Sequence, residues 1–134
     1  MGADGSIAAM FSWKRPTNLG VKEGRLAPCK RSPNCVSSQA DPADREHYIA
    51  PIRGDIGSAR RAVESMPRTR VIRAEGDYLY AEFRSKLLGY VDDVEFYFDG
   101  SMLQVRSASR LGRRDFGVNR KRIEALRALL TRRP

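Results

Sequence analysis

The sequence predicts a small α+β domain in which an antiparallel sheet carries two helices on one face. Four segments of strand length follow one another between residues 69 and 109, each alternating in hydrophobicity and separated from the next by a short turn. Segments with apolar residues at helical spacing flank them, at 55–66 and 116–130. Because 134 residues suffice to bury one hydrophobic core without staples, we expect a single domain.

Local signals place each element. Asp55 is a suitable N-cap for the first helix, and Pro67 marks the end of that helix. Asp99-Gly100 is a two-residue hairpin signal, and Gly76-Asp77 indicates another turn. Short links between the four strands make the sheet antiparallel. The predicted order is a strand at 48–53, a helix at 55–66, strands at 69–75, 78–85, 91–98 and 101–109, and a helix at 116–130.

The first 47 residues contain four prolines and no sustained hydrophobic period. We expect residues 1–18 to be a flexible leader, with Met1 and Met10 both suitable as a start. Residues 19–134 then form the domain. Its first part is predicted to be an extended arm that packs along the body from about Leu19 onward, because a long irregular segment in a compact domain needs such packing.

Alternation sorts the strand residues into two faces. The two helices are expected to cover an apolar face, made by Leu79, Ala81, Phe83, Val94, Phe96, Phe98, Leu103 and Val105. The opposite, polar face carries Tyr78, Tyr80, Glu82, Arg84, Asp93, Glu95, Tyr97, Gln104 and Arg106. Since antiparallel sheets commonly leave one face in water, we expect cross-strand ion pairs among its charged residues.

The order of elements resembles the single repeat of the TATA-box-binding-protein-like fold. In that fold a curved antiparallel sheet carries two helices on its convex side. The resemblance concerns topology alone, so it implies nothing about function.

The net charge of +9 is concentrated at the C-terminal end, where residues 106–134 carry ten Lys or Arg against two Asp or Glu. Arg113, Arg114 and Arg120 lie where the last helix begins, and unpaired N–H groups already make that end positive. The run 106–122 therefore predicts a small anion or a partner protein as ligand. Asp115 could instead satisfy the same donors as an N-cap, and weak nucleic-acid binding by the C-terminal helix is a further alternative.

The sequence lacks a signal peptide and any apolar run of about 18 residues, which predicts a cytoplasmic protein. Cys29 and Cys35 are spaced so that they can close a small loop, but a reducing cytosol would keep both as thiols. With only His47 to join them, we expect no metal. Phosphate-loop and dinucleotide motifs do not occur, and we expect no cofactor.

An enzyme is the alternative to a non-catalytic binding or accessory module. Cys35 could act as a nucleophile if a nearby cation lowered the pKa of its thiol. Asp93 and Glu95 share a strand face and could do acid–base chemistry or hold a hard cation. His47, the single histidine, is expected to be solvated or locally hydrogen-bonded.

Several blocks of the chain, in order, resemble the family known as domain of unknown function 1499. They are GVKEGRLAPCKRSPNCVSSQ (20–39), YLYAEFRS (78–85), VDDVEFYFD (91–99), VRSASR (105–110) and DFGVNRKRIEALR (115–127). The resemblance implies no particular activity, but it implies that the polar residues of these blocks lie together. We divide them into a ligand-binding set of Arg84, Arg106, Ser107, Ser109, Arg110, Arg113, Asn119 and Arg120, and an arm network of Asn34, Cys35, Ser37, Ser38, Asp92 and Asp93. We expect the arm to lie against the sheet edge or the polar face, and a network that only fixes the arm there is the competing interpretation.

Overall fold

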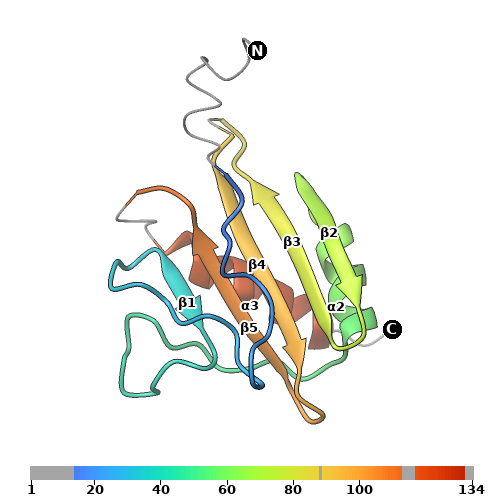
Figure 1. Cartoon of the computed structure of the whole chain (residues 1–134). Helices are drawn as coiled ribbons and strands as arrows, with labels where there is room; N and C mark the ends of the chain where they lie inside the picture. The colour runs from blue at the N-terminus through green and yellow to red at the C-terminus, as the bar shows by residue number, and fades with distance from the viewer. Residues whose placement is uncertain (1–13, 88, 113–116, 132–134) are drawn as a thin grey trace.

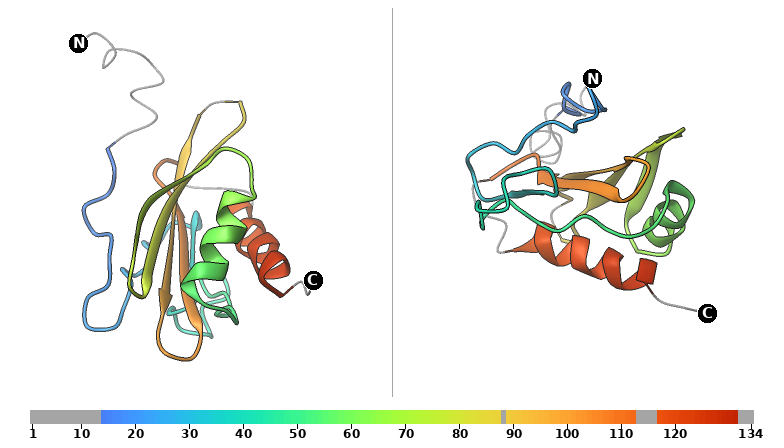
Figure 2. Two further views of the ribbon diagram at one scale, coloured as in Figure 1. Left: turned by 90° about the vertical axis from the view of Figure 1, so that its right-hand side faces the viewer. Right: turned by 90° about the horizontal axis from the view of Figure 1, so that it is seen from below.

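The computed structural model describes residues 14–87, 89–112 and 117–131. One five-stranded antiparallel sheet has the order β1-β5-β4-β3-β2, and two helices pack on one of its faces (Figures 1 and 2). The predicted α+β class is confirmed, and the order of elements agrees with the prediction except for the position of the first strand. The elements are β1 (Cys35–Ser37), α2 (Ile56–Glu64), β2 (Thr69–Glu75), β3 (Tyr78–Arg84), β4 (Val91–Phe98), β5 (Leu103–Ser109) and α3 (Val118–Thr131).

The first strand is not the predicted one. Residues 48–53 make only two isolated bridges, Ser37 to Tyr48 and Ile52 to Leu103, because Pro51 lacks the N–H that a ladder needs. Ile49 and Ile52 nevertheless reach the core, which explains their apolar pattern. The true first strand lies in the arm, where Cys35 pairs with Ala108 of β5.

The turns and helix ends follow local chemistry with one correction. Asp55 and Ser58 form a capping box at the start of α2, as the N-cap prediction requires. Gly76 has φ +58°, which suits the tight β2–β3 turn. The β4–β5 loop contains four residues, not two, because the Asp99 carboxylate accepts hydrogen bonds from the backbone N–H of Ser101 and of Met102.

The apolar face is buried as predicted. Leu79, Val94, Phe96 and Val105 are almost inaccessible to water. They pack against helix residues, among them Ile123 of α3. Phe116, which the sequence placed on the helix stripe, lies outside the described residues.

Most of the polar face is shielded from water, in contrast to the expectation that this face stays solvated, and of its residues only Arg84 at one end of β3 is exposed. The arm crosses it from Lys14 onward, on the side of the sheet opposite the helices (Figure 2, left). Leu26 of the arm packs against Tyr78 and Tyr80, with Leu19 and Val21 beside it. The domain therefore has three layers: helices, sheet and arm.

Candidate functional site

The arm covers a cluster of three carboxylates and three guanidinium groups, called here the ionic cluster: Glu82, Asp93, Glu95, Arg15, Arg106 and Arg110. Arg110 is bidentate to Asp93, with Nε 2.9 Å from Oδ2 and Nη2 2.8 Å from Oδ1. The same Nη2 donates to Glu82 at 2.6 Å, and Arg15 donates to Glu82 from the arm at 2.8 Å. Glu82, Asp93 and Arg110 of the polar face are thus held in compensating pairs.

Glu95 lies deepest in the ionic cluster and is 0% exposed. Its Oε2 accepts a hydrogen bond from the Tyr78 hydroxyl at 2.5 Å and one from the backbone N–H of Gly20 at 2.7 Å. Burial raises the pKa of Glu95 despite these donors. Burial would also raise the pKa of Glu82, but the hydrogen bonds from Arg15 and Arg110 outweigh it and lower that pKa.

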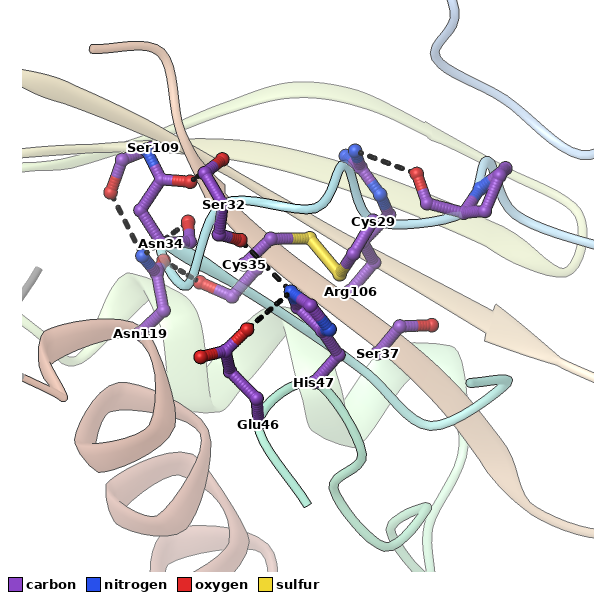
Figure 3. The surroundings of a disulfide bond; sticks show 12 residues. Cys29, Ser32, Asn34, Cys35, Ser37, Glu46, His47, Arg106, Ser109 and Asn119 are labelled. Atoms are coloured by element: carbon purple, nitrogen blue, oxygen red, sulfur yellow. Dashed lines mark hydrogen bonds and ion pairs between the residues drawn. A yellow bond between two sulfur atoms is a disulfide. The ribbon is translucent and has the colours of Figure 1, made fainter. Parts of the chain in front are cut away.

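A second polar network lies on the other face of the sheet, toward α3. The Asn119 side chain accepts a hydrogen bond from Ser107 at 2.5 Å and donates to Ser109 at 2.8 Å. It also donates to the backbone carbonyl of Asn34 at 3.2 Å, which ties the arm to the helix (Figure 3). Arg122, at the edge of this network, pairs with Asp92 at 2.8 Å.

Strand alternation therefore divides the predicted ligand-binding set between two faces. Ser107, Ser109 and Asn119 lie on the helix side, whereas Arg106 and Arg110 lie under the arm. Arg120 and Arg84 belong to neither group. The Arg120 guanidinium donates to backbone carbonyls of the 45–48 turn, at 2.8 Å for Tyr48, and exposed Arg84 donates to Gly89 at 3.5 Å. Arg113 lies outside the described residues.

The predicted arm network is similarly spread. Ser38 bonds to β5, where its hydroxyl donates to Gln104 at 2.8 Å and accepts from the Val105 backbone at 2.7 Å. Asn34 donates to the carbonyl of Gly112 at 2.6 Å, so it fixes the start of the turn before α3. The Ser37 hydroxyl accepts a hydrogen bond from Gln39 within the same loop. These contacts hold the arm on the edge of the sheet.

Cys29 and Cys35 are joined as a disulfide, with an S–S distance of 2.05 Å. Of the two states that the sequence left open, a closed bridge and a pair of thiols, the structure has the bridge. Beside the bond, both ring nitrogens of His47 face acceptors. Nε2 lies 2.9 Å from the Ser32 carbonyl (Figure 3), and Nδ1 lies 2.8 Å from the Asp44 carboxylate. Burial opposes protonation, but the hydrogen bonds to Asp44 and Ser32 outweigh it, and the pKa of His47 is raised. His47 is locally hydrogen-bonded, as one of the two predicted alternatives has it.

A cavity of about 370 Å³ lies between the arm and the end of β5, and is called here the arm cavity. It brings together five predicted residues: Asn34, Cys35, Arg106, Ser109 and Arg110. The other described residues that line it are Lys14, Pro16, Thr17, Asn18, Lys30, Ser32, Ala108 and Gly112. Among the lining residues that the structure describes, four are cationic and none is acidic.

Arg106 is the buried member of this lining, with 5% of its surface exposed. Its Nη2 donates to the carbonyl of Pro28 at 3.4 Å, and its Nη1 lies 3.8 Å from Glu95 Oε1. Within the described chain, Arg106 Nε and Glu95 Oε1 have no hydrogen-bond partner. A guanidinium group has five N–H donors, so Arg106 retains unused capacity to bind an acceptor.

Sequence reasoning missed Lys14 and Lys30 as members of the candidate site. Lys30 lies between the two cysteines. Because Cys35 pairs with β5, the disulfide to Cys29 also keeps Lys30 close to that strand. Lys14 lies in the segment expected to be a flexible leader, and no periodicity marked it. A second cavity of about 400 Å³ lies by the disulfide and is lined by His47, Asp44, Asp41 and Arg25 among others.

Neither helix within the described ranges is long and apolar enough to cross a membrane. A family model described as a protein of unknown function (DUF1499) matches residues 25–130. No curated protein and no solved structure matches the chain. The likeness to the TATA-box-binding-protein-like fold thus stays a prediction.

Proposed function

The chain belongs to the DUF1499 family of proteins of unknown function, and we propose that it is a non-catalytic binding or accessory module that holds a small anion in the arm cavity. The observation that carries the proposal is a cavity whose described lining contains four cations and no carboxylate, with Arg106 buried among them and its Nε without a hydrogen-bond partner. Gly112 lines the cavity and is the first residue of the basic turn before α3. The sequence predicts an anionic ligand or partner for this turn.

Arg106 supplies the chemical argument. A buried charge is costly unless it is paired and hydrogen-bonded, and its nearest carboxylate oxygen lies 3.8 Å away. An anion in the cavity would give the guanidinium the acceptors that it lacks, in a charge-assisted geometry. Arg110 contributes less to anion binding, because its guanidinium group already forms ion pairs with Asp93 and Glu82.

The size of the cavity restricts the ligand. A volume of about 370 Å³ is near the lower limit of small-molecule sites. Exposed Lys14 and Lys30 add positive charge without a carboxylate beside them in the lining. We infer a compact phosphate or carboxylate compound as ligand.

The contacts of the candidate catalytic groups support binding without chemistry. Cys35 is held in the disulfide, and both nitrogens of His47 are engaged. Asp93 is paired with Arg110, and Glu95 is bonded to Tyr78. An enzyme using Cys35 or the Asp93 and Glu95 carboxylates would have to break these contacts first.

The alternative of polyanion binding by the C-terminal helix is less well supported. Arg127 donates to the carbonyls of Pro51 and Ala50, both at 2.6 Å, and Arg120 caps the 45–48 turn. Arg122 pairs with Asp92. These arginines stabilise the fold, so fewer charges are left to follow a phosphate backbone.

The predicted cytoplasmic location rests only on the absence of targeting signals. The Cys29–Cys35 bond argues against a permanently reducing environment, because cytosolic thiol pools keep such pairs open. We propose an environment in which this bond forms for at least part of the protein's lifetime.

Calorimetric titration of the full chain with inorganic phosphate and with citrate tests the proposal. We expect saturable binding of at least one probe, weakened about threefold in Lys30→Gln and about tenfold in Arg106→Gln. Lys30 is exposed, so its variant leaves the core intact, and Lys86→Gln serves as the matched control at an exposed lysine that does not line the cavity. No saturable binding, or equal affinities of the Lys30 and Lys86 variants, would contradict the proposal.

A further inference from the structure

The disulfide closes the segment that forms one wall of the arm cavity. Lys30, Ser32 and Asn34 lie between the two cysteines and line the cavity, as does Cys35 itself. Cys35 is fixed independently of the bond, because β1 pairs with β5. Cys29 makes no backbone hydrogen bond within the described chain, so the disulfide is what ties its end of the wall to Cys35.

Few other contacts hold this wall. Over the part of the chain that the structure describes, the backbone of residues 27–33 makes no hydrogen bond to another backbone group. The Pro28 carbonyl accepts from Arg106 at a long 3.4 Å, and the Ser32 carbonyl lies 2.9 Å from His47. If the bond opened, residues 28–31 would gain freedom, whereas β1 and β5 would keep their pairing.

We propose that the Cys29–Cys35 bond is a redox switch that sets the affinity of the arm cavity for its anion. The inference rests on the proposed function, since it concerns the same cavity. With the bond closed, Lys30 and the Pro28 carbonyl that orients Arg106 are held in place. With the bond open, binding must first order this segment, which weakens affinity.

The chemistry is thiol–disulfide exchange with a dithiol reductant. One reductant thiolate attacks Cys29 Sγ, the sulfur of the more accessible cysteine, and forms a mixed disulfide as Cys35 leaves as a thiolate. The second reductant thiol then displaces Cys29 and becomes part of the reductant's own disulfide. Two electrons and two protons pass to the protein, which ends with two thiols. Arg106 lines the same cavity as Cys35, and a nearby cation favours a departing thiolate.

The test measures phosphate affinity by calorimetry for the oxidised full chain, for the chain reduced with dithiothreitol, and for the double variant Cys29→Ser, Cys35→Ser. We expect reduction to weaken binding about tenfold, reoxidation to restore it, and the double variant to match the reduced protein. Dithiothreitol should leave the affinity of the double variant unchanged, which controls for effects of the reagent. Amide exchange in β3 and β4 should be the same in both redox states, because their pairing does not involve the bond.

The outcomes separate the two proposals. Equal affinity in the oxidised and reduced states would overturn the switch and leave the binding function standing. No phosphate affinity in either state would overturn the binding function and the switch with it. Loss of amide protection in β3 and β4 on reduction would show a structural staple in place of a switch.

Discussion

The helix-covered face and most of the arm-covered face of the sheet are shielded from water, but the two faces are built from different chemistry. Phe96, Val94 and Leu103 pack against α2 and α3 on the first face. On the second face the ionic cluster and two tyrosines lie under the arm. Apolar burial has no directional requirement, whereas each buried charge needs a particular partner.

This difference has a consequence for function. The partners in the ionic cluster come from the arm and from β3, β4 and β5, so they fix how the arm lies on the sheet. At the end of β5 the compensation is incomplete, because the charged residues in the described lining of the arm cavity are all cationic. The arm-covered face can thus accept an anion, whereas the helix-covered face offers apolar packing.

The largest expected effect comes from the helix-covered face. Phe96 is 0% exposed, and Phe96→Ala should lower the free energy of unfolding by about 4 kcal/mol through lost burial and a residual cavity. Urea denaturation measures this change. Leu87→Ala, at a side chain that is 89% exposed, is the control and should change stability by less than about 0.5 kcal/mol. Equal effects of the two substitutions would mean that the core is wrongly placed.

Arg110→Met tests the arm-covered face. It leaves Asp93 and Glu82 without their shared partner, so we expect a loss of about 3 kcal/mol in urea denaturation. Arg73→Met is the control, because Arg73 forms an exposed pair with Glu75 and should contribute below about 1 kcal/mol. A neutral Arg110 variant would refute the assignment of these charges to a tightly coupled cluster.

His47 makes stability depend on pH. Because the folded pKa is raised, its contribution is fully present below the unfolded value of about 6.5 and is lost as pH rises through the folded pKa. The groups that face the ring are Asp44, Glu46 and the Ser32 carbonyl. The urea concentration at the midpoint of unfolding should decrease as pH rises from about 5.5 to about 8.5. The decrease should be steeper for the native chain than for His47→Asn. Identical slopes would show that His47 is not protonated in the fold.

The smallest effect is expected at the edge of the ionic cluster. The Arg15 side chain is half exposed, so its pair with Glu82 is screened by solvent. Arg15→Gln should lower the free energy of unfolding by less than about 1 kcal/mol, with a decrease in the effect at high salt. A loss as large as that of Arg110→Met would place Arg15 among the fully buried charges instead.

Much of the fold could be predicted because its signals are local. Alternation in 78–85 and 91–98 gave the apolar face, and Asp55 with Pro67 gave the limits of α2 closely. The strand at Cys35–Ser37 could not be found, since three residues show no period and their partners in β5 lie about 70 positions away. Residues 48–53 were misassigned because core burial and strand pairing give the same apolar pattern.

The site was harder to predict for a related reason. The family blocks correctly pointed to polar residues that meet, such as Asn34 with Asn119. Alternation along β5 places the neighbours Arg106 and Ser107 on opposite faces of the sheet. The prediction instead placed the whole basic run on one surface, so it grouped residues that the structure separates. The pairs that consume the charges, such as Arg15 with Glu82, join positions 67 residues apart, and no local pattern indicates them.

The central claim is that the arm cavity binds a small anion through Arg106 and Lys30. A chemical-shift titration of the isotope-labelled full chain with inorganic phosphate tests it most directly. We expect saturable shifts in the amides of residues 28–35 and 106–112, and little change in α2 or β2. Shifts spread over the basic residues of α3 and β2, or no saturable shift at all, would contradict the claim.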